Sequence, residues 1–330
     1  AHNNMQLAFA NSQCISELEL ARCIVIDVAI HGMGRGAGNL NAELFLDYLN
    51  SIIDEKYNIK ALLNVMDEVI SGFFEKKPWG YSLPNYLSAV YMSHPNYAYY
   101  LSNKRTLTLE AMDEIFGLIN PNKRYEYDEK YIEQLYIDYL SRKKGKELFA
   151  NVIKNSIGKD ILLIAPGSSA YEEKEKINSF IRDNSPMVIS INFYYPYASI
   201  DYIFVSNMRR FRQLNDSLYS KTIVTSNIKA NGVFATVDYE SLLNSIDMVR
   251  DNACLMAMKL FADNYLSSIY IAGLDGYSHS NCDYAFENLT IPNNSLGLSL
   301  EKINKGIAKF MSEFSEKHNI CFLTSSIFAN

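Results

Sequence analysis

What the sequence lacks excludes several classes of protein. No uninterrupted apolar stretch in its 330 residues reaches the roughly 18 residues of a membrane-spanning helix, so no membrane association is expected. The net charge is −6, without the excess of Lys and Arg that a broad DNA- or RNA-binding surface requires. The opening, Ala1-His2-Asn3, lacks the basic stretch and the apolar core of a signal peptide. Five cysteines occur without a C-x-x-C pair, which predicts the reduced thiols of a cytoplasmic protein rather than a zinc or redox site.

What is present is typical of a soluble globular protein of about two domains. Hydrophobic residues make up 48% of the chain and charged residues 21%, so there is enough apolar surface to offset the entropy of ordering. The patterns change twice along the chain. We therefore expect domains over residues 1–57, 58–155 and 156–330.

The first zone reads as a strand, a glycine-rich loop and a helix. The β-branched run Ile24–Ile30 predicts a buried parallel strand. It leads into the loop His31–Asn39, and apolar residues then recur at helical spacing over Leu44–Ile53. Glycines in such a turn let backbone N–H groups approach an anion closely. The sequence thus predicts an anion-binding loop, in which Arg35 could bind the same carboxylate.

The other two zones differ in their periodicity. Residues 58–155 show helical apolar stripes punctuated by prolines and no convincing strand. Residues 156–330 alternate between strands and helices, which predicts a doubly wound, Rossmann-like parallel sheet in an α/β domain. The strands are expected at Ile161–Ala165, Met187–Phe193, Tyr202–Val205, Thr222–Thr225, Ser268–Ala272 and Ile320–Leu323. The helices are expected at Glu172–Ile181, Asp251–Asp263 and Leu300–Phe314.

The start of the chain resembles one enzyme family. His2-Asn3-Asn4, a helix, and a second strand ending in G-M-G-R-G-A-G-N (residues 32–39) look like the last two β/α units of the metal-dependent pyruvate aldolases. These enzymes, typified by 4-hydroxy-2-oxovalerate aldolase, belong to the DRE-TIM metallolyase superfamily. The strict match covers residues 2–43. The resemblance implies an incomplete (β/α)8 TIM barrel in residues 1–57, followed by a helical post-barrel domain.

The resemblance also implies roles for individual residues. His2 would be a metal ligand and Asn39 a further ligand, holding Mn²⁺ or Mg²⁺ in the full-length protein. The loop residues Gly34, Arg35, Gly36 and Gly38 would contact a 2-oxo acid. The expected activity is carbon–carbon lyase chemistry, in which a 4-hydroxy-2-oxo acid is cleaved to pyruvate and an aldehyde, or formed from them. This chain would then be the C-terminal part of a longer enzyme, inactive alone, with a homo-oligomer or a dehydrogenase as its partner.

The helical zone supplies one catalytic candidate. The aldolases carry an active-site tyrosine in their post-barrel domain, and Tyr81 is the residue that matches it by position. An ordinary tyrosine at the start of a helix explains Tyr81 equally well. Both interpretations stay open on sequence alone.

The third zone contains a second candidate site. Gly167, Ser168 and Ser169 follow the first expected strand, while Asn192 and Asp275 follow later ones. Ligands of open α/β sheets bind outside the carboxyl ends of the strands, so these residues predict a phosphate-containing ligand. The segment Ile269–Asp275 resembles, more faintly, a strand of bacterial sialyltransferases, although Pro166 departs from their first loop. His279 is the only histidine near these strand ends.

Three functions therefore remain open at this stage. The first is the C-terminal part of a metal-dependent aldolase. The second is a nucleotide-sugar-binding or glycosyltransferase-like module in residues 156–330. For this module, an ordinary turn without a ligand explains the Gly-Ser loop about as well as a nucleotide-sugar site does. The third is a last domain that only mediates assembly.

Overall fold

The computed structural model describes residues 1–53, 56–76, 78–142, 158–262, 268–277 and 297–329. The contacts divide the chain into two compact units, Ala1–Ile137 and Asp138–Asn330. Among the described residues, no helix combines the length and the apolar character needed to cross a bilayer. The domain boundaries expected at residues 57 and 155 stay predictions.

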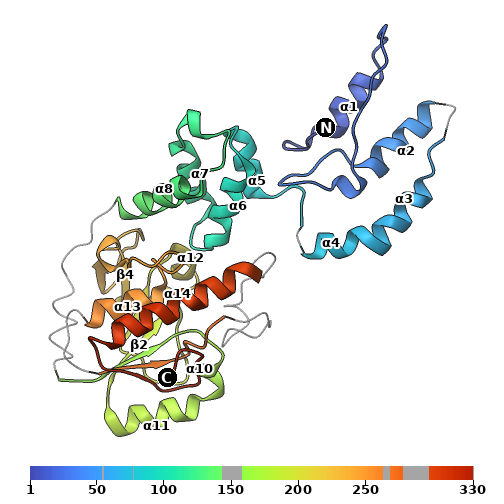
Figure 1. Cartoon of the computed structure of the whole chain (residues 1–330). Helices are drawn as coiled ribbons and strands as arrows, with labels where there is room; N and C mark the ends of the chain where they lie inside the picture. Colours follow the sequence, from blue (N-terminus) through green and yellow to red (C-terminus); the bar gives the residue numbers. More distant parts are fainter. Residues whose placement is uncertain (54–55, 77, 143–157, 263–267, 278–296, 330) are drawn as a thin grey trace. The chain divides into compact units, whose positions relative to one another are not determined.

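Unit 1 is helical in the part that the structure describes. Its helices are α1 (Ala8–Ser16), α2 (Ala42–Ile52), α3 (Ile59–Val65), α4 (Ser71–Lys76), α5 (Leu83–Val90), α6 (Pro95–Lys104), α7 (Leu109–Leu118) and α8 (Glu129–Ser141), the last of which runs past the unit boundary (Figure 1). A π-helical turn over Met66–Ile70 joins α3 to α4, and short 3-10 turns occur at Ile30–Gly32 and Pro121–Lys123.

Local sequence explains where several of these helices begin. Ser82 and Thr108 cap α5 and α7, because the side-chain oxygen of each accepts a hydrogen bond from the backbone N–H three residues later. Pro84 and Pro95 lie in the first turns of α5 and α6, where the missing N–H costs nothing.

The strand predicted over Ile24–Ile30 is not formed. Residues 23–28 have no regular structure, and Val25 is 84% exposed. The nearest approach to a strand is a single parallel bridge between Ala29 and Asn41. The physical reason is the lack of neighbours, since a buried parallel strand needs partners on both edges and the described part of unit 1 contains no named strand.

Unit 2 is an α/β domain built on a seven-stranded parallel sheet. The strands are β1 (Ile161–Ile164), β2 (Met187–Ile191), β3 (Tyr202–Val205), β4 (Thr222–Thr225), β5 (Ala235–Val237), β6 (Ile269–Ala272) and β7 (Ile320–Phe322). The helices are α10 (Ser169–Glu172), α11 (Lys174–Asn184), α12 (Met208–Phe211), α13 (Ala253–Ala262) and α14 (Gly297–Ser315). Short 3-10 helices span Asp216–Lys221 and Glu240–Leu242.

The six strands expected from sequence are confirmed, within a few residues at their ends. They form because each is a short apolar run that is buried in the sheet, as in β1, whose four residues are all inaccessible. The three-residue strand β5 was not predicted, because Ala235–Val237 carries too short a pattern to recognise. Helices cover the sheet on both sides, with α13 and α14 on one side and α11 on the other (Figure 1).

The strand order indicates where a ligand of an open α/β sheet is expected to bind. The order is β5-β4-β3-β2-β1-β6-β7, so the chain builds outward from β1 to β5 and then returns to the other side of β1. Ligands of open α/β sheets lie at such a reversal, outside the carboxyl ends of the strands. In this domain that place is the end of β1 and β6.

Candidate functional site

The glycine-rich loop of unit 1 has the backbone geometry that its composition predicts. Gly36 and Gly38 adopt φ values of 61° and 76°. A Cβ atom at Gly38 would lie 2.5 Å from the carbonyl oxygen of Gly32 and 3.3 Å from the ring of Trp79. This position therefore requires glycine both for its dihedral angle and for its close contacts.

The two expected metal ligands are neighbours on paired backbone segments. His2 and Asn39 form an antiparallel bridge, flanked by a hydrogen bond of 2.8 Å from the N–H of Leu40 to the carbonyl of Ala1. The side-chain amide nitrogen of Asn39 donates to the carbonyl of Met33 over 2.8 Å, which leaves its oxygen as a potential ligand.

These residues do not make a metal site by themselves. The part of the chain that the structure describes holds no group of three or more His, Cys, Asp or Glu side chains that could bind a metal ion. Mg²⁺ and Mn²⁺ are usually held with carboxylate oxygens among their ligands, and the bridge brings together one imidazole and one amide.

The segment that carries Tyr81 is hydrogen-bonded to the same loop. The indole N–H of Trp79 donates to the carbonyl of His31 over 2.8 Å, and the N–H of Gly80 donates to the carbonyl of Gly36 over 3.0 Å. Tyr81, the next residue, is 56% exposed. The structure thus places the backbone of three sequence-predicted elements together: His2, the glycine loop and the start of the Tyr81 segment.

His31 fixes the beginning of this loop. Its φ is 55°, an uncommon value for a residue with a side chain. Its ring packs edge-on against Phe74 and Trp79, with centroid distances of 4.9 and 5.9 Å. Its backbone N–H donates to the carboxylate of Glu43 over 2.9 Å. These contacts hold the chain in the strained conformation that turns it into the glycine loop.

In unit 2 the Gly-Ser turn after β1 lies against Asp275, at the end of β6. The carboxylate of Asp275 accepts hydrogen bonds from the N–H of Ser169 over 2.8 Å and from the hydroxyl of Ser168 over 3.3 Å. The hydroxyl of Ser169 also donates to this carboxylate, and its oxygen lies 2.8 Å from the hydroxyl of Thr324. The sequence-predicted residues Ser168, Ser169 and Asp275 are therefore brought together.

This arrangement changes the interpretation of the turn. The N–H and hydroxyl donors that were expected to bind a phosphate already bind a carboxylate from the same chain. A phosphate at the same place would meet the negative charge of Asp275. The hydrogen bonds between the Gly167–Ser169 turn and Asp275 connect the ends of β1 and β6, and we call this set of contacts the β1–β6 latch. An anionic ligand would have to bind elsewhere along this edge of the sheet.

Asn192 organises the neighbouring strand ends. It has a φ of 65°, and its side-chain oxygen accepts a hydrogen bond from the N–H of Ser206 over 3.1 Å. The amide of Asn227 in turn donates to the carbonyl of Ser206 over 3.1 Å. The ends of β2, β3 and β4 are thus linked by polar contacts.

Sequence reasoning missed a second polar cluster at this edge. The hydroxyl oxygen of Ser226 accepts a hydrogen bond from the N–H of Tyr239 over 3.1 Å, and the phenol of Tyr239 donates to Asp251 over 3.2 Å. This chain of contacts connects the ends of β4 and β5 to the start of α13. The sequence feature that could have indicated this cluster is Arg250-Asp251-Asn252, which directly precedes an apolar helix. Asn252 caps that helix, because its side-chain oxygen accepts from the N–H groups of Cys254 and Leu255.

Within the part of the chain that the structure describes, three buried polar atoms beside this cluster have no hydrogen-bond partner. They are the hydroxyl oxygen of Thr225, the side-chain oxygen of Asn227 and the Nε of Arg250. Thr225 and Asn227 flank Ser226, and Arg250 precedes Asp251. A buried polar atom without a partner is costly, and such atoms in a native protein commonly mark the place of a ligand or an ordered water.

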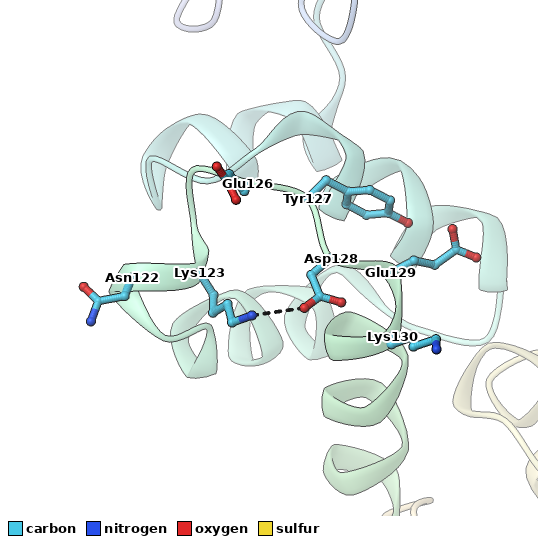
Figure 2. Close-up of a pocket in the computed structure, with 7 residues that line it drawn as sticks. All are labelled: Asn122, Lys123, Glu126, Tyr127, Asp128, Glu129 and Lys130. Atoms are coloured by element: carbon cyan, nitrogen blue, oxygen red, sulfur yellow. Dashed lines mark hydrogen bonds and ion pairs between the residues drawn. The ribbon is translucent and has the colours of Figure 1, made fainter.

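Unit 1 also has an open hollow of about 500 Å³ in the loop before α8. Figure 2 shows its lining residues, Asn122, Lys123, Glu126, Tyr127, Asp128, Glu129 and Lys130, with Lys123 paired to Asp128 over 3.1 Å. The N–H of Tyr131 and the ammonium of Lys123 hold the pKa of Asp128 below its usual value. Burial raises the pKa of Tyr127 to about 12, so its phenol stays protonated. The hollow carries both charge signs, which gives it no clear ligand preference.

His279 lies outside the described residues. Comparisons of the chain with protein-family models, with curated proteins and with solved structures found no match.

Proposed function

We propose that unit 2 binds a nucleotide or a nucleotide sugar along the carboxyl-terminal edge of its sheet. The observation that carries this proposal is the set of three unpartnered atoms, on Thr225, Asn227 and Arg250, beside one hydrogen-bonded cluster. These atoms lie at the carboxyl end of β4 and before α13, on the edge of the sheet where ligands of open α/β sheets bind but away from the reversal at β1 and β6.

The chemistry of these atoms suits such a ligand. The Nε–H of Arg250 needs an acceptor, and a phosphate oxygen is the strongest one available. The side-chain oxygen of Asn227 needs a donor, such as a sugar hydroxyl or a base N–H. The hydroxyl of Thr225 accepts either kind of partner. A nucleotide sugar offers all of these groups in one molecule.

Ligand binding by the complete chain tests this proposal. We expect one or more of the CMP- and UDP-sugars to raise the melting temperature at saturating concentration, since a ligand at one hundred times its Kd stabilises a protein by about 2.7 kcal/mol. The absence of a shift with every CMP- and UDP-sugar would contradict the proposal.

Two threonines of β4 provide a matched pair of variants. Thr225→Val removes a hydroxyl without a partner, so the free protein should keep or gain stability while ligand affinity falls. Thr222→Val removes a hydroxyl that donates to Leu218 over 2.9 Å, so the free protein should lose about 1 kcal/mol of stability with no loss of affinity. Equal effects of both substitutions on affinity would count against the site.

For unit 1 we propose a part in a metal-dependent 2-oxo-acid aldolase. The observation that favours it is that backbone pairing joins His2 to Asn39 while Gly80 donates to Gly36, which gathers the residues matched to that family. Arg35 is exposed on this loop, where its guanidinium can bind the carboxylate of an acid. Tyr81 is the candidate for proton transfer.

This second proposal requires ligands from elsewhere. An imidazole and an amide alone do not hold Mn²⁺ or Mg²⁺ tightly, so we derive no reaction step for the chain by itself. The experiment compares the 330-residue chain with the whole polypeptide encoded by the reading frame that contains it, and measures Mn²⁺-dependent release of pyruvate from a 4-hydroxy-2-oxo acid. We expect activity only from the whole polypeptide, and its loss in His2→Ala. Turnover by the 330-residue chain, or none by the whole polypeptide, would contradict it.

A further inference from the structure

Two half-exposed tyrosines in unit 2 share one lysine. The Nζ of Lys174 lies 4.4 Å from the ring centroid of Tyr171 and 5.2 Å from that of Tyr197. The two ring centroids are 5.6 Å apart. Tyr171 is 43% exposed and Tyr197 is 38% exposed, so part of each side chain faces solvent. We call these three residues the Tyr–Lys platform.

The platform stands on a rigid support beside the β1–β6 latch. Tyr171 belongs to α10, which begins at Ser169, one of the residues bound to Asp275. The fully buried Tyr195 donates its hydroxyl to the carbonyl of Ala170 over 3.0 Å and packs edge-on against Tyr197. The loop that carries Tyr197 is therefore held against α10, so little further ordering is needed when a ligand binds.

The charge of Lys174 is available for a ligand. No carboxylate among the described residues forms an ion pair with it, whereas the nearby Lys176 pairs with Glu173 over 3.5 Å. Aromatic faces stack with the flat faces of ring ligands, and an ammonium group beside them attracts a negative charge.

We propose that the Tyr–Lys platform binds a ring that carries a phosphate, with the ring against Tyr197 and the phosphate beside Lys174, whose ammonium lies nearer to Tyr171. The inference rests on the ligand-binding role proposed for unit 2. It assigns one ring of that ligand, with the attached phosphate, to the Tyr–Lys platform. The shared chemistry, a ring with an attached phosphate, occurs both in a nucleotide and in a sugar phosphate.

Titration calorimetry on the complete chain distinguishes these sources. The probes are UMP, glucose 1-phosphate, uridine and inorganic phosphate. We expect UMP or glucose 1-phosphate to bind at least tenfold more tightly than uridine and inorganic phosphate, and the preferred probe identifies the source. If neither of the two binds, or if inorganic phosphate binds equally well, the inference is overturned.

Variants locate the binding. Tyr197→Ala and Lys174→Met should each weaken the preferred probe by at least tenfold, and Tyr197→Phe, which keeps the ring, should not. The control is Tyr194→Ala, because Tyr194 lies in the same loop and is 44% exposed. Melting temperatures of all variants identify any that fail to fold, in which case Lys174→Met, at a partly exposed charge, decides. Equal effects of Tyr194→Ala and Tyr197→Ala would overturn the inference.

The same measurements distinguish failure of this inference from failure of the function proposed for unit 2. If nucleotide sugars bind with an affinity that depends on Thr225 and not on Lys174, the function stands and the platform fails. If a ring phosphate binds with an affinity that depends on Lys174 while no nucleotide sugar binds, the platform stands and the nucleotide-sugar function fails.

Discussion

The carboxylate of Asp275 accepts a hydrogen bond of 2.8 Å from the backbone N–H of Ser169, 106 residues earlier in the chain. This contact, with those from the two serine hydroxyls, joins the ends of β1 and β6 where the strand order reverses. The Asp275 carboxylate also occupies the turn in which an anionic ligand was expected to bind.

Removing the charge of Asp275 should weaken this latch. We expect Asp275→Asn to lower the free energy of unfolding by about 2 kcal/mol, because hydrogen bonds to a charged acceptor are lost and an amide N–H would face the donors of the turn. Urea unfolding followed by circular dichroism measures the change. Asp183→Asn, at an exposed carboxylate of α11, should change it by less than about 0.5 kcal/mol. Equal changes in the two variants would show that the latch does not stabilise the domain.

Two glycines with the same φ allow the cost of backbone strain to be measured separately from the cost of steric overlap. Gly232 and Gly273 both have a φ of 72°. A Cβ at Gly232 would have no atom of the described residues within 4 Å, whereas one at Gly273 would collide with the carbonyl oxygen of Ala165 and lie 2.9 Å from the Cβ of Ala170. We expect Gly232→Ala to cost about 1 kcal/mol from the left-handed conformation alone. Gly273→Ala should cost about 2 kcal/mol more, from overpacking. Thermal unfolding of both variants checks the difference, and similar losses would contradict it.

The phenol of Tyr97 organises the loop that forms the hollow of unit 1. Its oxygen lies 2.8 Å from the carbonyl oxygens of Lys123 and Glu126, which share its single O–H proton, and it accepts from the N–H of Asp128 over 3.3 Å. We expect Tyr97→Phe to reduce the free energy of unfolding by about 1–2 kcal/mol, since these backbone groups lose a partner. Tyr125→Phe, at a ring that is 74% exposed, serves as the control and should be neutral in the same urea titration. A neutral Tyr97→Phe would contradict this role.

The same loop should make stability depend on pH. The N–H of Tyr131 and the ammonium of Lys123 lower the pKa of Asp128 in the folded state, below an unfolded value of about 3.9. The stability this provides is therefore complete above the unfolded pKa and is lost as the pH falls through the folded pKa. Asp128→Asn should lower the melting temperature at pH 6 and have a smaller effect at pH 2.5. An equal effect of Asp128→Asn at both pH values would refute the prediction.

Cysteine reactivity should follow burial. Cys254 lies inside α13, and burial raises the pKa of its thiol to about 12, whereas Cys14, Cys23 and Cys321 are exposed. We expect iodoacetamide at pH 8 to alkylate these three rapidly and Cys254 only after denaturation, because the thiolate is the reactive form. Peptide mass spectrometry over a time course measures each rate. Rapid labelling of Cys254 in the folded chain would show that α13 opens readily.

The sequence by itself determined six of the seven strands of unit 2. Short apolar runs such as Ile161–Ile164 predict buried strands, and in unit 2 these runs have neighbouring strands to pair with. It also determined the residue types of the glycine loop, since Gly38 must fit a φ of 76° close to Gly32. The same local reasoning failed for Ile24–Ile30, because a strand exists only when a neighbour satisfies its backbone groups.

Only the tertiary structure decided what the strand ends do. The sequence placed Asp275 and the turn before α10 at the same edge of the sheet, but it could not show that the carboxylate fills this turn, because the partners are 106 residues apart and the contact depends on which strands are adjacent. For the same reason it could not single out Thr225, Asn227 and Arg250, whose common feature is a buried atom without a partner. Local patterns specify which elements form, whereas long-range packing determines which polar groups are satisfied and which remain for a ligand.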